Sequence, residues 1–309
     1  MNERSVGLIG VGNMGGAMAL HLLDLGYEVG VRDLDPGREA AAVRHGARAF
    51  ATPAALAAVH RVVIVAVVDA AQSEAVLFGS DGAAAVAMAG ACVLLCPTIG
   101  PASTEAIAAR LGERGVECID APMSGGPARA RAGSMSLMVA CADEVFSAHR
   151  PLIDALSSQV FRVGTRPGDG ARTKLVNNLL AAINLAGAAE ALALAERIGL
   201  DAARTLAVIE QSSGQSWIGS DRMRRAIAGD FAPRAHTSLL AKDTRLAIAM
   251  ADSAGFDAAL GGAAAAVFAR ACSAGLSGLD DASLLELLRR RERRGAYDPG
   301  TGPGDRSAD

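Results

Sequence analysis

The sequence predicts a doubly wound α/β sheet followed by an all-α C-terminal domain, with one long helix joining the two parts. Short apolar runs alternate with helical segments up to residue 164, a pattern typical of a parallel sheet covered by helices. Beyond residue 164 no alternating β-branched run occurs, and the segments have helical periodicity. The turn-rich stretch 164–170 separates the two patterns, so we expect domains at 1–164 and 165–292. The charged, Gly- and Pro-rich tail 293–309 is expected to be disordered.

In the first part, strands are expected where short apolar runs lie between turn residues. They occupy residues 6–9, 28–33, 62–67, 92–96, 117–121, 136–141 and 159–163. Proline fits the first turn of a helix, where its missing N–H is not needed, and threonine caps a helix by accepting a backbone hydrogen bond. Helices are therefore expected at 13–25 and 36–45, after Thr52-Pro53, and after Gly100-Pro101.

In the second part, helices are expected at 172–198, 202–211, 221–228, 238–254, 258–273 and 281–291. The first is predicted to be unusually long, at about 25 residues. Its apolar stretch 175–195 is interrupted by Asn177, Asn178, Asn184 and Glu190, which favours a buried helix of a soluble protein over a membrane span.

The composition argues against several classes of partner. A net charge of −3 provides no strong field for nucleic acid or an anionic membrane, and 3% aromatic residues argue against base stacking. The N-terminus has no secretory pattern, so we expect a cytoplasmic protein without a membrane segment. The five cysteines form no CxxC pair and no two histidines have ligand spacing, which favours buried free thiols over a metal site.

The motif Gly10-Val11-Gly12-Asn13-Met14-Gly15 directly follows the first strand and opens the first helix. In this context the first glycine makes a tight turn, the second lets a pyrophosphate approach the backbone, and the third lets the helix pack on the strand. The helix N-terminus adds N–H groups and the positive end of its dipole. The sequence therefore predicts a dinucleotide-binding domain of the Rossmann type.

Asp33 ends the second strand, about 20 residues beyond the glycine motif. An acid at this position binds the ribose hydroxyls of NAD and repels the 2′-phosphate of NADP. We therefore expect NAD as the cofactor, with NADP remaining possible because Arg32 and Arg38 lie close by and could reverse the preference.

Of the 30 basic residues, only Lys174 and Lys242 are lysines. Arginine cannot give up its proton near neutral pH, whereas a lysine held against apolar neighbours has a lowered pKa. Lys174 and Asn178 are four residues apart and share one face of a predicted helix, among apolar leucines and a valine. This pattern favours a lysine general acid/base with an asparagine beside it. The alternative is a solvated lysine at the start of the helix.

A second glycine-rich segment, Asp120-Ala121-Pro122-Met123-Ser124-Gly125-Gly126-Pro127, follows a predicted strand. Ser124, Gly125 and Gly126 can present a hydroxyl and backbone N–H groups to a carboxylate, although an ordinary loop has the same composition. Lys242-Asp243 opens a further helical stretch and belongs either to a site or to a surface charge pair.

Together these segments resemble the β-hydroxyacid dehydrogenase family, which includes 3-hydroxyisobutyrate, tartronate semialdehyde and L-threonate dehydrogenases. The matching segments are 7–15, 120–126, 168–178 and 242–247, in the family's order. The resemblance implies hydride transfer between NAD(P) and a small 3-hydroxy carboxylate, in a homodimer or homotetramer that associates through the helical domain. The alternatives are an imine reductase-like enzyme, which generally lacks the lysine, and a non-catalytic NAD-binding protein.

The resemblance also implies roles for individual residues. Lys174 matches the catalytic lysine, and Ser124, Gly125, Gly126 and Asn178 match substrate-binding positions. Cofactor contacts are expected at Gly10, Gly12, Asn13, Met14, Gly15, Asp33, Val67, Val68, Thr98 and Lys242.

The chain departs from the family pattern in three places. Cys96-Pro97-Thr98 replaces the frequent Ser-Ser-Thr, and the glycine hinge before Gly168 is one residue longer. Arg129 and Arg131 follow the Ser-Gly-Gly loop and could reach a second anionic or polyhydroxylated end of the substrate. The segments 213–217 and 229–234 are similar to the L-threonate-like branch.

Overall fold

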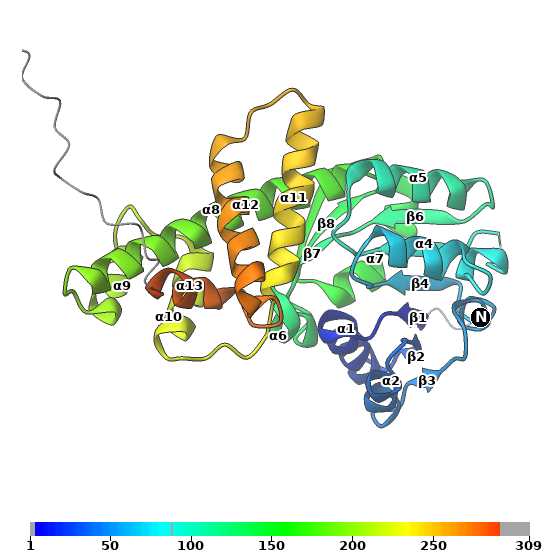
Figure 1. The fold of residues 1–309 in the computed structure, drawn as a ribbon. Coiled ribbons are helices and arrows are strands. Elements are labelled where there is room, and N and C mark those ends of the chain that lie inside the picture. Colours follow the sequence, from blue (N-terminus) through cyan, green and yellow to red (C-terminus); the bar gives the residue numbers. More distant parts are fainter. Residues whose placement is uncertain (1–3, 88, 291–309) are drawn as a thin grey trace, which may run out of the picture.

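The computed structural model describes residues 4–87 and 89–290 (Figure 1). The tail expected to be disordered, residues 293–309, lies outside the described residues. Within the described part, a sheet covered by helices comes first and a group of helices follows. The fold class expected from the sequence is therefore confirmed.

The sheet contains nine strands in the order β3-β2-β1-β4-β5-β6-β8-β7, with β9 paired to β8. Their bounds are β1 (Ser5–Ile9), β2 (Glu28–Arg32), β3 (Arg48–Ala49), β4 (Val62–Val65), β5 (Cys92–Leu95), β6 (Glu117–Asp120), β7 (Met123–Ser124), β8 (Ser136–Ala140) and β9 (Gln159–Gly164). Strands β1 to β6 run parallel, and β1 lies between β2 and β4. The connections therefore change direction at β1, and in such sheets a crevice opens there at the carboxyl ends of the strands.

Both faces of the sheet are buried beneath helices, because successive side chains of a strand point to opposite faces. Leu8 and Leu94 belong to one core, with Leu22 of α1, whereas the adjacent Ile9 and Leu95 belong to the other, with Leu56 of α3. Strands buried on both faces are continuous apolar runs, which is why the sequence shows them clearly. The helices of this part are α1 (Asn13–Asp24), α2 (Pro36–Val43), α3 (Pro53–Ala57), α4 (Ala70–Phe78), α5 (Pro101–Gly112), α6 (Gly126–Arg131) and α7 (Asp143–Leu156).

The end of the sheet differs from the parallel arrangement expected. Strand β8 runs antiparallel to both β6 and β7. The apolar pattern of a strand is the same in either direction, so its direction depends on the connection before it. Helices α4, α6 and α7 were also not expected; α7 carries Pro151 in its interior, which disguises the helical pattern.

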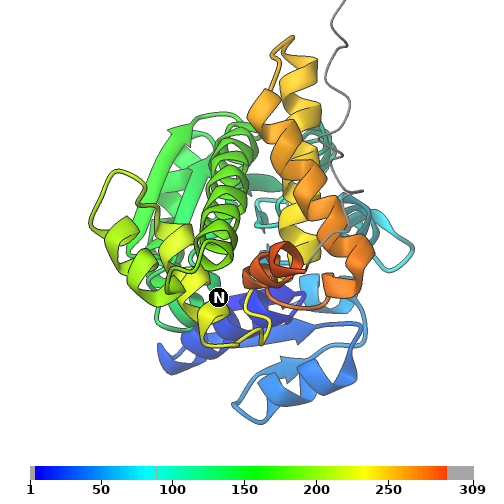
Figure 2. The same ribbon diagram turned by 60° about the vertical axis from the view of Figure 1, so that its left-hand side comes forward.

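The helical part is built on α8 (Asp169–Arg197), a helix of 29 residues that begins earlier than expected. It is followed by α9 (Ala202–Glu210), α10 (Trp217–Ile227), α11 (Thr237–Ser253), α12 (Ala259–Ala271) and α13 (Leu284–Arg289). Helices α11 and α12 pack against α8, as both views show (Figures 1 and 2). Leu185 and Leu192 of α8 form a core with Phe268 of α12.

Two apolar segments are long enough to cross a membrane by length and composition alone, α8 and the stretch Ala259–Leu276. Leu175, Leu185 and Leu192 of α8 are fully buried in the protein. A helix that is apolar around much of its circumference is expected when neighbours cover it on several sides. Packing against the other helices therefore accounts for the buried leucines of α8, whereas Val176, Leu180 and Leu194 of the same helix are exposed.

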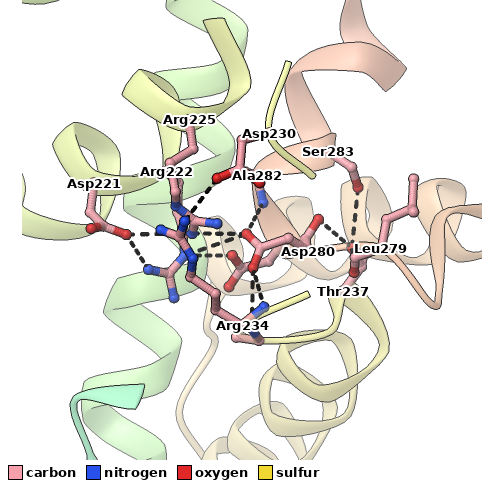
Figure 3. A network of polar contacts seen from close by, with 12 residues as sticks. Asp221, Arg222, Arg225, Asp230, Arg234, Thr237, Leu279, Asp280, Ala282 and Ser283 are labelled. Carbon is pink, nitrogen blue, oxygen red and sulfur yellow. Dashed lines mark hydrogen bonds and ion pairs between the residues drawn. The ribbon is translucent and has the colours of Figure 1, made fainter. Parts of the chain in front are cut away.

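A buried network of charges connects α10 with the segments before α11 and α13 (Figure 3). Asp280 has no exposed surface; it forms an ion pair with Arg225 at 2.9 Å and accepts backbone hydrogen bonds from Arg234, Ala235 and Ala282. Burial opposes ionisation of this carboxyl, but these donors outweigh it and lower its pKa to about 2. A single carboxylate therefore organises three separate segments.

Candidate active site

The glycine-rich turn after β1 is shaped by close backbone contacts. Gly10 has a φ of +91°, and its N–H donates to the carbonyl of Arg32 at 2.8 Å. A Cβ on Gly10 would lie 2.8 Å from the carbonyl oxygen of Ala66, and one on Gly15 would overlap the carbonyl oxygen of Gly10. Only glycine is compatible with the turn and with the close contact between α1 and β1.

The N-terminus of α1 has no side-chain cap. Gly12 occupies the N-cap position there, whereas Asp35, Thr52 and Asp69 accept backbone hydrogen bonds at the starts of α2, α3 and α4. Uncapped N–H groups and the helix dipole together attract an anion. Gly12 is half-buried and Asn13 is exposed, so the turn is open to a ligand and fits the pyrophosphate of a dinucleotide.

Asp33 supports this turn from the end of β2. Its Oδ2 accepts a hydrogen bond from the Val11 N–H at 2.7 Å, and its Oδ1 accepts one from the Asp35 N–H at 2.9 Å. Each carboxylate oxygen has a second lone pair, which leaves acceptors for ribose hydroxyls.

The two arginines near the turn are differently engaged. Arg32 forms an ion pair with Glu39 at 2.9 Å. Arg38 is exposed and lies 3.4 Å from the Asp35 carboxylate, and a Cβ on Gly12 would lie 3.1 Å from its Nη1 atom. Of the two arginines, Arg38 is therefore the one that borders the turn.

Lys242, on α11, connects the helical part with the carboxyl ends of two strands. Its ammonium donates hydrogen bonds to the carbonyl oxygens of Val68, at 2.9 Å, and Thr98, at 2.6 Å. These residues follow β4 and β5, next to β1 and its glycine turn. Val67 and Met14 are half-buried and pack on the cores on opposite faces of the sheet. The structure thus brings Val68, Thr98 and Lys242 together at the crevice.

Lys174 is a buried lysine, with only 6% of its surface exposed. Burial lowers the pKa of its ammonium to about 8; the nearby Asp243 carboxylate opposes this shift and Lys242 adds to it. Among the described residues, none accepts a hydrogen bond from the Lys174 side chain. The group is therefore poised to exchange a proton near neutral pH and is available to a ligand.

Asn178 lies one turn after Lys174 and is held by Asp243 of α11. Its Nδ2 donates to the Asp243 carboxylate at 2.7 Å, and its Oδ1 accepts from Asn177 at 3.0 Å. Asp243 is 8% exposed, and its other oxygen lies 3.2 Å from the Lys242 ammonium. Asp243 therefore orients Asn178 and adds negative charge beside both lysines.

The Ser-Gly-Gly segment begins at the edge strand β7 and continues into α6. Gly125 and Gly126 have φ values of +127° and +75°, which other residues rarely adopt. Asp120, at the end of β6, accepts hydrogen bonds from the N–H groups of Gly168, at 2.7 Å, and Ala171, at 3.1 Å. This contact joins the strand before the segment to the start of α8, one turn before Lys174.

Asp120 and Asp243 are the functional candidates for which sequence reasoning assigned no role. Both belong to recognised segments, but no local pattern indicates that they are buried or which distant groups they contact. Burial raises the pKa of Asp120 to about 6, although backbone hydrogen bonds from α8 counteract it.

One group of potential metal ligands occurs among the described residues. Cys92, Glu117 and His149 have ligand atoms within 4.8 Å of one another. Cys92 and Glu117 are the first residues of β5 and β6, so the group lies at the edge of the sheet opposite the crevice. Burial raises the pKa of the Cys92 thiol, and Glu117 lies 3.2 Å from His149. The Cys92 thiol is therefore protonated, and it lies beside the pair formed by Glu117 and His149.

The dinucleotide turn, the crevice and the converging lysines define the class of protein, an NAD(P)-dependent oxidoreductase. Residues 5–164 match a family model described as the NAD binding domain of 6-phosphogluconate dehydrogenase. Residues 168–288 match one described as NAD-binding of NADP-dependent 3-hydroxyisobutyrate dehydrogenase. The chain belongs to the β-hydroxyacid dehydrogenase family, as its motifs suggested.

Individual relatives extend over nearly the whole chain. An L-threonate dehydrogenase of Cupriavidus necator is 37% identical over 93% of this chain and 96% of its own length. A 3-hydroxyisobutyrate dehydrogenase of Pseudomonas aeruginosa is 34% identical over 93% of this chain and 99% of its own. A crystal structure of 3-hydroxyisobutyrate dehydrogenase from Salmonella typhimurium superposes with a TM-score of 0.85 at 34% identity, covering 92% of this chain and 99% of that one.

Proposed function

We propose that the protein oxidises the hydroxyl group of a small 3-hydroxy carboxylate, with Lys174 as the general base. The observation that carries this proposal is a buried lysine with a pKa near 8, beside Asn178 and Asp243. Lys242, on the helix that carries Asp243, contacts the ends of β4 and β5 at the crevice. These contacts support a proton-transfer group, Lys174, that lies next to the proposed cofactor site.

In this mechanism the substrate carboxylate binds the Ser124 hydroxyl and the backbone N–H groups of Gly125 and Gly126. Neutral Lys174 removes the hydroxyl proton, and Asn178 holds the same oxygen. A nicotinamide cofactor held at the glycine turn Gly10–Gly15 would supply the hydride acceptor. In the reverse direction the Lys174 ammonium donates its proton to the oxygen. General acid–base catalysis of this kind contributes about 10²–10⁴-fold to the rate.

We propose NAD as the preferred cofactor. Asp33 places a carboxylate beside the glycine turn, where it would bind ribose hydroxyls and repel a 2′-phosphate. Arg38 is the counteracting group. We expect kcat/KM to be higher with NAD than with NADP. The ratio of these two values should be smaller in Asp33→Ala. An unchanged ratio in the variant would remove the role of Asp33.

For the substrate we propose an L-threonate-like or 3-hydroxyisobutyrate-like acid, supported by the relatives of those names. The test is cofactor reduction with a panel of hydroxyacids, with Lys174→Ala assayed in parallel. Turnover that is lost in the variant supports the proposal, whereas turnover that survives contradicts the role of Lys174. Cofactor binding without turnover on any acid would favour an imine substrate or a non-catalytic role.

We further propose a cytoplasmic homodimer or homotetramer. Large apolar side chains are exposed along the helical part, including Val176, Leu180 and Leu194 of α8 and Leu260 of α12. Val176 and Leu180 are four residues apart and share one face of α8, and an exposed apolar face of this kind supports an interface with a second copy. Light scattering of the purified protein tests this directly, and a monomeric mass at micromolar concentration would contradict it.

A further inference from the structure

Arg129 lies directly against the segment assigned to the substrate carboxylate. It is exposed on α6, one turn after Gly125. A Cβ on Gly125 would lie 2.8 Å from Cδ and 3.1 Å from Cβ of Arg129. The aliphatic stem of the arginine therefore packs on this glycine, and its guanidinium extends beyond the loop.

The guanidinium is oriented by an aromatic ring from the other part of the protein. Its central carbon lies 5.6 Å from the ring centroid of Trp217, the first residue of α10. A cation over an indole face is attracted by the ring quadrupole, while the N–H groups at the guanidinium edge remain free to donate. Trp217 is itself 56% exposed, so the pair is accessible to a ligand.

Arg129 also lacks a counter-ion among the described residues, unlike its neighbours. Arg131, which the sequence offered for the same role, instead forms an ion pair with Asp24 at 2.6 Å. Arg222, the other arginine near the Trp217 ring, is paired with Asp281 and Asp221. Of these three cations, only Arg129 has its donors unengaged by a carboxylate.

We propose that Arg129 binds oxygen atoms at the end of the substrate remote from the carboxylate held by the Ser-Gly-Gly loop. This inference rests on the proposed function of that loop. The guanidinium favours hydroxyacids whose far end carries hydroxyl or carboxylate oxygens, because it presents several donors in a fixed plane. An acid that carries only a methyl group besides its carboxylate and its reacting hydroxyl leaves these donors without partners. Arg129 is therefore a specificity-determining residue, and Trp217 positions it.

The test compares three substrates in the wild-type enzyme and in Arg129→Met. Besides the carboxylate and the hydroxyl that is oxidised, L-threonate carries further hydroxyls, 2-(hydroxymethyl)glutarate carries a second carboxylate, and 3-hydroxyisobutyrate carries only a methyl group. We expect Arg129→Met to lower kcat/KM about 10- to 100-fold for oxygen-bearing acids, because each loses hydrogen bonds to a charged donor. The value for 3-hydroxyisobutyrate should change less than about threefold. The acid that suffers the larger loss identifies whether hydroxyl or carboxylate oxygens are bound.

Arg131→Met is the matched control, because it removes the same side chain from the same helix at a position paired with Asp24. It should leave all three values within about threefold of the wild type. Equal losses on all three substrates in Arg129→Met, or the same pattern in Arg131→Met, would overturn the inference while the proposed function stands. A wild-type enzyme that oxidises none of the acids would instead overturn the proposed function, and this inference with it.

Discussion

At the scale of single residues, the central feature is Lys174, one of two lysines in a chain whose other basic residues are arginines. Lys174 is buried with its ammonium unpaired by hydrogen bonds to the described residues, and its pKa is lowered to about 8. An arginine at this position would remain protonated and could not act as a base. The carboxylate of Asp243 prevents a further fall in this pKa.

The first prediction concerns pH. Oxidation needs the neutral amine of Lys174, so kcat/KM for oxidation should rise as the pH increases through about 8 and then level off. The reverse reduction needs the ammonium and should decline over the same range. Lys174→Arg should lose about 10²–10⁴-fold in both directions while still binding cofactor. Initial rates between pH 6 and about 10 provide the measurement; a profile without this ionisation would contradict the assignment.

The second prediction concerns Asp243. Asp243→Asn preserves an acceptor for Asn178 but removes the negative charge that raises the pKa of Lys174. The rising limb of the oxidation profile should therefore move to lower pH. The same pH series in the variant is the measurement. A limb that stays in place would show that Asp243 acts only by holding Asn178.

At the scale of elements, the start of α1 differs from the starts of the three helices that follow it. Helices α2, α3 and α4 are capped by their own side chains, whereas α1 begins at an uncapped glycine. At the start of α8, backbone N–H groups donate hydrogen bonds to the carboxylate of Asp120, which is distant in the sequence. The uncapped terminus of α1 faces the crevice, where the phosphates of a dinucleotide would complete its hydrogen bonds.

The third prediction tests the contact between α1 and β1. In Gly15→Ala the new Cβ would overlap the Gly10 carbonyl oxygen, so the helix must move away from the turn. We expect at least a tenfold weaker cofactor affinity and a loss of about 1–3 kcal/mol in the free energy of unfolding. Gly112→Ala, at the end of α5, introduces a Cβ with no atom within 4 Å and should be neutral or slightly stabilising. Cofactor titration and urea unfolding measure both; wild-type affinity in Gly15→Ala would refute this account.

At the scale of the whole molecule, the helical part depends on a set of buried charges. Asp280 connects α10 to the segments before α11 and α13 (Figure 3). Lys242 connects α11 in turn to the ends of β4 and β5. The position of the helical residues relative to the cofactor turn therefore depends on both sets of contacts.

The fourth prediction is that Asp280→Asn lowers the free energy of unfolding by about 3–5 kcal/mol, because it leaves the buried Arg225 only its longer contact, at 3.4 Å, with the partly exposed Asp221. The pKa of Asp280 is about 2, below its ordinary value of 3.8, so its stabilising effect is present at neutral pH. That contribution should disappear as the pH falls from about 4 to 2. Asp230→Asn breaks an exposed pair with Arg234 and should cost at most about 1 kcal/mol. Equal urea midpoints for the two variants would contradict the prediction.

Much of the fold could be predicted because its signals are local. The strands β1, β4 and β5 are continuous apolar runs, since both sheet faces are buried. The direction of β8 could not be predicted, because the apolar pattern of a strand carries no direction. Similarly, Lys174 could be selected from its rarity and its apolar neighbours, but the carboxylate that raises its pKa could not be identified. Asp243 lies in another helix, and no sequence spacing relates the two.

By itself, then, the sequence determined the dinucleotide turn, the change from alternating strands and helices to helices alone, and the set of candidate side chains, because these depend on neighbours within one or two turns of chain. The tertiary structure decided which groups meet. It buried Asp120, Asp243 and Asp280 against distant donors, left Arg129 facing Trp217, and paired Arg131 with Asp24. Burial and charge pairing depend on contacts between residues far apart in the chain. These contacts set the pKa of a group such as Lys174 and leave the Arg129 guanidinium without a carboxylate partner among the described residues.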